Sequence, residues 1–235
     1  MQKFKFIKPN KISLTNTDVV DELSSAIDSK KLLGIGEVHG VKDNVDLYFT
    51  VFEKFGFDCI ALEYPVDCHS DLLSFLKTGE LTDHWFFSEI NDGRFNHEML
   101  SMLKILHESG QLKKIICYDK RNNTTVWNER DKDYADAFLE NYDENLKTLV
   151  TGGGHHLKTE TFELPQETGN LYPMGYHLKE TLGDFPTAKI IYTSGEFFNF
   201  GKQSFQKLDQ FDENIRKIGN MRYEFVLEDV RSIEI

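Results

Sequence analysis

The stretch that decides the fold is KLLGIGEVHG, residues 31–40. It begins as a short and nearly continuous apolar run, which is typical of a strand buried on both faces of a parallel sheet. It then changes to glycine, glutamate and histidine where such a strand would end. Ligands of open α/β sheets bind beyond the carboxyl ends of the strands. This stretch therefore predicts a central strand and also the first two side chains of a site, Glu37 and His39.

Further apolar runs follow along the chain, and longer segments with helical periodicity separate them. The predicted strands are residues 31–36, 58–63, 113–119, 146–152, 188–193 and, as an edge strand, 223–227. The predicted helices are residues 17–29, 44–55, 96–107 and 128–145. This alternation predicts an α/β fold of three layers, with a mostly parallel central sheet and helices on both faces. A chain of 235 residues without repeats or linkers is expected to form one domain over residues 1–235.

Two predicted connections are longer than the two to six residues that are usual in such folds. They span residues 64–93 and 157–186. Long connections at the carboxyl ends of strands often build lids and pocket walls. We expect the first connection to form a small helical lid, and we predict that Tyr64 and Trp85, which lie in it, contact the substrate.

Composition excludes several classes of function. The 27 basic and 39 acidic residues give a formal net charge of −12, so the chain repels nucleic acids and anionic lipid surfaces on average. No apolar run approaches the roughly 20 residues needed to cross a bilayer. The first residues alternate lysine with apolar residues and lack the apolar core of a signal peptide. Three cysteines without metal-ligand spacing agree with reduced thiols, so we expect a cytoplasmic protein that acts on a small molecule.

Acids and imidazoles follow four of the predicted strands. The candidates at these strand ends are Glu37, His39, Glu63, Asp119, His155 and His156. Glu63 follows an apolar run that should be buried, and a buried acid needs a partner. A lone acid such as Asp119 is commonly a helix cap or an ion-pair partner. Because adjacent residues point apart, we expect only one of His155 and His156 to enter the site.

Converging carboxylates and imidazoles support two kinds of chemistry. They can position a water molecule and transfer its protons as general acids and bases, or they can bind a metal ion. A dinucleotide site is disfavoured because the third glycine of its fingerprint would fall at His39, and Glu37 would place a carboxylate where the pyrophosphate binds. Neither a Walker A motif nor GxSxG occurs, so hydrolysis by activated water is favoured over a seryl intermediate.

The order of these motifs resembles a known family. The series GIGEVHG, FDCIALEYP, ICYD, NERDKDYADAFLENY, GGGHHL and YPMGYHL is similar to the erythromycin-esterase-like proteins and their haem-binding ChaN-like relatives. The resemblance covers about residues 32–192. It implies that Glu37, His39, Glu63 and His156 are catalytic, with His155 as the alternative to His156. It also implies a role for Asp119, which we expect to contact the substrate. Arg130 would stabilise an oxyanion or, alternatively, form an ion pair at a helix start.

The resemblance implies a hydrolase that acts on an ester or related acyl compound and requires no cofactor. In this hypothesis His39 is the general base, held by Glu37 or Glu63, and His156 and Arg130 stabilise the oxyanion. One alternative is a metal-dependent hydrolase with a divalent ion at Glu37, His39, Glu63 and His156. Another is a non-catalytic protein that binds a small ligand or haem. One residue separates Glu37 from His39, as in the ChaN-like branch, and the chain lacks room for the helical insertion of macrolide esterases. The sequence leaves the oligomeric state open.

Overall fold

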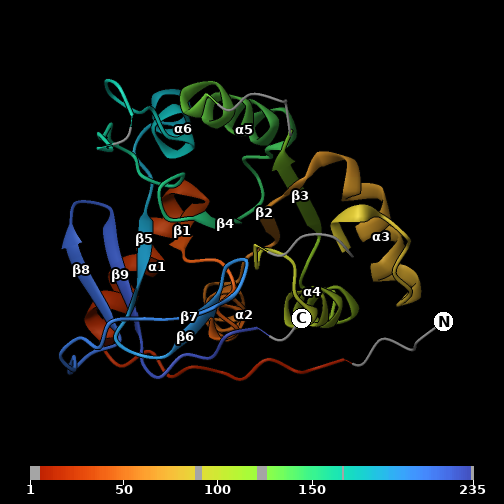
Figure 1. Ribbon diagram of the computed structural model, residues 1–235, viewed down its shortest axis with the longest axis horizontal. Coiled ribbons are helices and arrows are strands. Elements are labelled where there is room, and N and C mark those ends of the chain that lie inside the picture. The colour runs from red at the N-terminus through yellow and green to blue at the C-terminus, as the bar shows by residue number, and fades with distance from the viewer. Residues whose placement is uncertain (1–5, 88–91, 121–125, 166, 234–235) are drawn as a thin grey trace.

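The computed structural model describes residues 6–87, 92–120, 126–165 and 167–233. Within them, the chain forms a seven-stranded sheet between two layers of helices (Figure 1). The sheet order is β3-β2-β4-β1-β5-β9-β8. The strands are β1 (Leu32–Glu37), β2 (Cys59–Pro65), β3 (Lys114–Asp119), β4 (Thr148–Gly153), β5 (Thr187–Tyr192), β8 (Ile215–Gly219) and β9 (Arg222–Leu227). Neighbouring strands are parallel except β8 and β9, so the predicted α/β class is confirmed.

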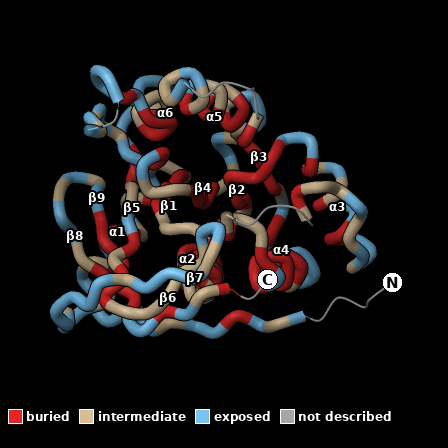
Figure 2. Tube along the Cα trace, viewed as in Figure 1, coloured by how far each residue is buried: buried red, intermediate tan, exposed pale blue. Residues whose placement is uncertain are grey.

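Two separate hydrophobic clusters hold the helices to the sheet. The larger cluster packs one face of the sheet against α1 (Thr17–Lys30), α2 (Asp43–Phe55), α3 (His69–Thr78) and α4 (His97–Glu108). The smaller one packs the other face against α5 (Trp127–Asn141) and α6 (Met174–Leu182). Figure 1 shows α5 and α6 above the sheet and α2 and α4 below it. The strands between them are mostly buried (Figure 2), which explains their continuous apolar sequences.

The five predicted strands that precede β9 agree with β1 to β5 to within about two residues at each end, as is usual at element boundaries. The predicted edge strand is wrong in its position, because β9 lies inside the sheet and β8 pairs beyond it. β8 has the sequence IRKIG, too short and polar to be recognised by an apolar run. The predicted helix 128–145 ends at Asn141, because Tyr142 is extended and the next residues form a turn.

The first long connection contains helical elements, as the sequence predicted, whereas the elements after β4 and β5 were not predicted. Residues 64–93 include two short turns, η1 (Val66–Cys68) and η2 (Trp85–Phe87), together with the helix α3. The connection between β4 and β5 contains α6, and a small hairpin of β6 (Glu196–Phe198) and β7 (Lys202–Ser204) follows β5. No helix in the described ranges is long and apolar enough to cross a membrane.

A topological switch point lies at the carboxyl ends of β1 and β4. These strands are neighbours, with Glu37 paired to Gly153 in the register. β1 continues into α2 on one face of the sheet, whereas β4 continues towards α6 on the other. Such divergence of neighbouring connections marks the usual ligand position in open α/β sheets. β2 flanks β4 on its other side, so the residues that follow these three strands share one edge.

Candidate active site

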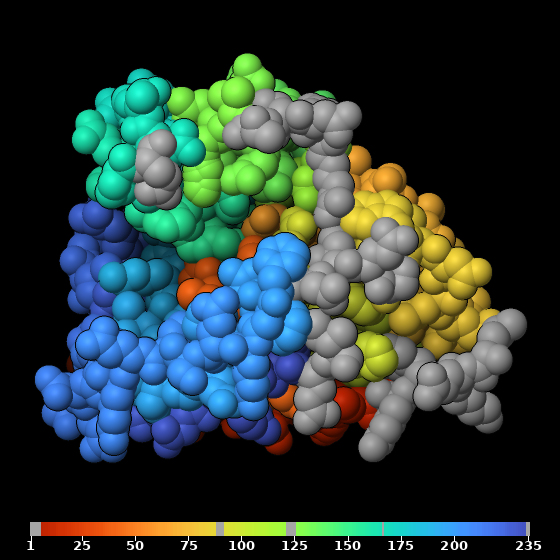
Figure 3. Space-filling model, viewed as in Figure 1, coloured from red at the N-terminus to blue at the C-terminus, as the bar shows by residue number. Residues whose placement is uncertain are grey.

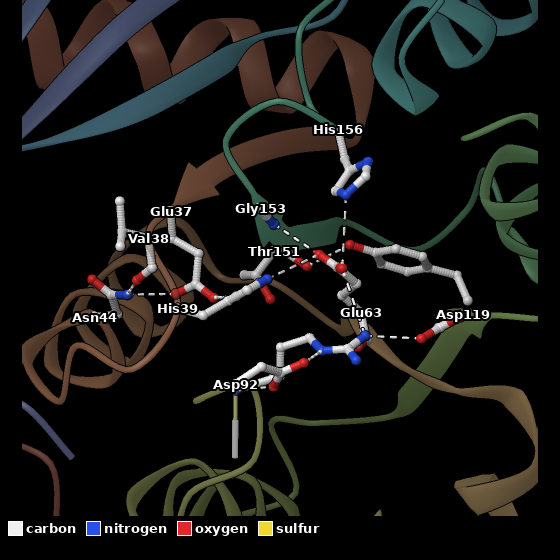
Figure 4. Close-up of polar contacts among 12 residues, drawn as sticks. Glu37, Val38, His39, Asn44, Glu63, Asp92, Asp119, Thr151, Gly153 and His156 are labelled. Atoms are coloured by element: carbon white, nitrogen blue, oxygen red, sulfur yellow. Dashed lines mark hydrogen bonds and ion pairs between the residues drawn. The ribbon is translucent and has the colours of Figure 1, made fainter. Parts of the chain in front are cut away.

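A buried carboxylate, Glu63 at the end of β2, lies at the centre of this edge (Figure 4). It is 7% exposed, and its Oε2 accepts a hydrogen bond from the Gly153 N–H at 2.8 Å. The Nε2 atom of His39 lies 3.6 Å from Oε2, and the Nε2 atom of His156 lies 3.9 Å from Oε1. Both gaps exceed a direct hydrogen bond. A water molecule or a substrate oxygen could therefore bridge each imidazole to the carboxylate.

The first imidazole, His39, is held by the acid two residues before it. The Nδ1 atom of His39 lies 2.8 Å from Oε1 of Glu37. The other oxygen of Glu37 accepts hydrogen bonds from the Asn44 amide and from the Tyr48 hydroxyl, the latter at 2.7 Å. Tyr192 in turn donates to Asn44 at 2.9 Å. This chain of contacts with α2 and β5 fixes the orientation of Glu37 and, through it, of His39.

The second imidazole, His156, is held by an acid that sequence analysis did not select. The Nδ1 atom of His156 lies 2.8 Å from Oδ1 of Asp131, which also accepts from the Met174 N–H at 2.7 Å. Asp131 is 2% exposed and lies on α5. A sequence signal was available, because Asp131 has helical spacing with the buried residues Tyr134 and Phe138. An acid on an apolar helix face indicates a partner inside the fold.

The guanidinium of Arg94 lies beside the Glu63 carboxylate and forms ion pairs with two further acids. Its Nη1 atom lies 2.8 Å from Oδ2 of Asp119 and 3.6 Å from Oε1 of Glu63. Its Nε atom donates to Asp92 at 2.7 Å. Sequence analysis missed Arg94 because it enters from the long connection after β2. Asp119 is therefore connected to the site by its ion pair with Arg94.

A contact between two glycines brings Arg94 to the site. The Gly40 N–H donates to the Gly93 carbonyl at 3.2 Å, and both residues have positive φ, 77° and 86°. A Cβ atom on Gly93 would lie 2.4 Å from the Cα atom of Gly40. Only glycine permits this approach of the two backbones. Gly40, which follows His39, and Gly93, which precedes Arg94, are thus held in direct contact.

Two other candidates, Arg130 and Tyr64, make their contacts with aromatic rings. The Arg130 guanidinium stacks over Trp127, 4.5 Å from the ring centroid, and the same ring packs edge-on against His156. Tyr64 is 2% exposed and packs on Phe86 in the core, with 4.5 Å between ring centroids, and its contact with a substrate stays a prediction.

The two remaining candidates lie in aromatic clusters. Trp85 packs edge-on against Phe86 at 5.8 Å between ring centroids, on the outside of the larger hydrophobic cluster. The ring of His155 stacks on Phe162, with 5.3 Å between centroids and 15° between planes. The side chain of His156, its neighbour, points instead towards Glu63 (Figure 4). The structure therefore brings His156 and not His155 to the carboxylate.

The charges of this cluster shift one another's pKa values. Burial alone would raise the pKa of Glu63, but the imidazoles of His156 and His39, the Arg94 guanidinium and the Gly153 N–H lower it to about 2. Burial alone would lower the pKa of His39, but the Glu63 carboxylate and the hydrogen bond with Glu37 raise it to about 9. At neutral pH, Glu63 is therefore ionised and His39 carries a proton.

Binding of a metal ion would require several ligand side chains around one position. In the described part of the chain, no group of three or more His, Cys, Asp or Glu side chains is arranged to hold a metal ion. The Arg94 guanidinium also supplies, beside Glu63, the positive charge that a cation would bring.

Comparison with known proteins identifies the class of fold. No family model and no curated protein matches the sequence. Solved structures do match, and they share the erythromycin-esterase-like and ChaN-like α/β fold that the sequence motifs predicted.

The matching structures cover most of the chain. A succinoglycan biosynthesis protein superposes with a TM-score of 0.68 over 96% of this chain and 95% of its own, at 12% identity. A protein from Bacillus cereus gives a TM-score of 0.61 over 97% and 95% of the two chains, also at 12% identity. An erythromycin esterase variant in its open conformation gives 0.58 over 85% and 82%, at 12% identity. At such identities the likeness shows the fold alone.

Proposed function

We propose that this protein hydrolyses an ester or a related acyl compound with a water molecule activated beside Glu63. The observation that supports the proposal is the position of one ionised carboxylate between two imidazoles, each held by its own acid. Acid and base catalysis typically uses pairs of titratable groups whose surroundings shift their pKa values apart, so that one is protonated and the other is not.

In this proposal His156 is the general base. The ring would act in its neutral form, in which Asp131 accepts the proton on Nδ1 and Nε2, directed at Glu63, is the acceptor. A water molecule between Nε2 and Oε1 would be oriented by both groups. Its oxygen attacks the acyl carbon while His156 takes one proton. When the tetrahedral intermediate breaks down, the bond to the alcohol oxygen breaks and His156 returns the proton to that oxygen.

His39 then has the opposite role from the one the sequence suggested. The sequence-based hypothesis made it the base, but an imidazole with a pKa of about 9 donates at neutral pH. Its Nε2–H, directed towards Glu63, would stabilise the negative charge on the former carbonyl oxygen. Arg94 is a positioning residue in this scheme, because its charge keeps Glu63 ionised while its hydrogen bonds are directed to Asp119 and Asp92.

The proposal is tested by turnover of a panel of small acyl esters by the wild-type protein and by His39→Ala. Loss of one oxyanion donor typically lowers kcat by about 10² to 10³, and we expect a decrease of this size on any ester that the wild-type protein hydrolyses. Circular dichroism and thermal unfolding of both proteins provide the folding control. Equal turnover by a folded His39→Ala protein would contradict the assignment.

A further inference from the structure

A second cleft lies on the other side of the segment that follows β4. Its volume is about 350 Å³, and it is bounded by residues 157–162, by β5 and by the β8–β9 hairpin. The smaller hydrophobic cluster, which holds α5 and α6, contains no residue of β5, β8 or β9, so this half of the sheet face stays open. In Figure 3 the teal atoms of the segment after β4 meet the dark blue atoms of this hairpin at the left of the molecule.

The walls of this cleft carry more positive than negative charge, although the protein has a net charge of −12. The cations are Lys158, Lys189 and Arg222, and Glu160 is the one acid that lines the cleft within the described ranges. Arg222 pairs with Glu160 at 3.2 Å. Lys189 pairs with Glu224, on the neighbouring strand, at 2.9 Å, and Glu224 also binds Arg216.

Lys158 differs from the other two cations. No carboxylate pairs with it among the residues that the structure describes, and its Nζ atom lies 3.8 Å from the ring centroid of Phe162. Burial and the charge of Lys189 lower the pKa of the Lys158 ammonium. The two ammonium groups thus repel each other across a concave surface, and an anion between them would remove that repulsion.

Apolar groups lie beside these charges. Leu157 and Phe162 line the wall of the cleft that carries Lys158, and Ile218 on β8 lines the opposite side. Ile218 is 48% exposed, which is high for a large aliphatic side chain. Binding sites for small organic molecules commonly combine such apolar walls with a few convergent polar groups.

We infer that this cleft binds a small organic anion, with a carboxylate or phosphate between Lys158, Lys189 and Arg222 and an apolar or aromatic body against Phe162 and Ile218. The inference concerns a different cavity from the Glu63 site, and it stands whether or not that site hydrolyses esters.

Isothermal titration calorimetry with phenyl phosphate, benzoate, inorganic phosphate and benzyl alcohol tests the inference. We expect saturable binding of phenyl phosphate or benzoate, and the stronger of the two identifies the head group. Inorganic phosphate should bind more weakly because it lacks the apolar body, and benzyl alcohol should not bind because it lacks the charge. Absence of saturable binding for both aromatic anions would overturn the inference.

Matched variants locate the site. Lys158→Met should weaken binding by about tenfold or more, the value of one charge-assisted hydrogen bond. Glu160→Gln should strengthen it, a gain that misfolding cannot produce. Lys132→Met, on the exposed face of α5, should leave affinity unchanged. If Lys158→Met binds like the wild type while His39→Ala loses binding, the anion occupies the Glu63 site and the inference is wrong.

Discussion

His156→Ala is expected to lower kcat by about 10² to 10⁴, the usual contribution of a general base. The buried imidazole of His156 is the one whose Nε2 faces Glu63 while Nδ1 is held by Asp131. The measurement is the steady-state rate on an ester that the wild-type protein hydrolyses. His155→Ala is the matched control, because the adjacent ring stacks on Phe162 instead of facing the carboxylate. We expect its rate to equal that of the wild type.

Asp131→Asn separates a catalytic role of His156 from a structural one. An amide can donate to Nδ1, which favours the tautomer with its proton on Nε2 and removes the acceptor that the water needs. We therefore expect kcat to fall in this variant while the fold is retained. A larger decrease in kcat for His155→Ala than for His156→Ala would contradict the assignment of His156 as the general base. So would an Asp131→Asn protein with full activity.

Arg94→Met is expected to lower the free energy of unfolding by about 3–5 kcal/mol at pH 7, the usual cost of leaving buried charges without their partner. Arg94 is the cation shared by Glu63, Asp119 and Asp92, and the first two of these acids are buried. Urea unfolding monitored by circular dichroism measures the change. The matched control is Arg222→Met, whose ion pair is exposed and should contribute no more than about 1 kcal/mol.

The loss of stability in Arg94→Met should depend on pH. In the wild type, the pKa of Glu63 is lowered from 4.5 to about 2, so its ionisation stabilises the fold fully above about pH 4.5 and this contribution is lost as the pH falls through about 2. Without Arg94 this pKa rises, so the difference in unfolding free energy between the variant and the wild type should become smaller as the pH falls from about 4.5 towards 2. A deficit that is small at pH 7, or that grows on acidification, would contradict the role given to Arg94.

The sequence was sufficient to predict the positions of the site residues that lie at the ends of strands or directly after them. Glu37, Glu63 and His156 follow runs that are apolar because both faces of the sheet are covered, so their strands and the common edge could be inferred together. The choice between His155 and His156 needed the turn after β4, where the His156 N–H bonds to the Gly153 carbonyl. That turn directs one ring inward and leaves the other beside Phe162.

The rest of the site depends on tertiary contacts. Arg94 reaches Glu63 because Gly93 packs on Gly40, and the position of Arg94 in a long connection gives no sign of that approach. Asp131 lies within a predicted helix, and its spacing with Tyr134 is the sequence signal that places it on the inward face. The protonation of His39 follows from distances and burial, which a residue pattern does not contain.

The central claim is that His39 is protonated at neutral pH and donates, because it lies between Glu37 and the ionised Glu63. Titration of the His39 ring by NMR, with its signals assigned by their absence from His39→Ala, tests this claim directly. We predict a pKa of about 9 in the wild type, and a lower value in Glu63→Gln, where the largest attraction that favours the charged ring is removed. A His39 that titrates at or below the ordinary value of 6.5 would contradict the claim and return to it the role of base.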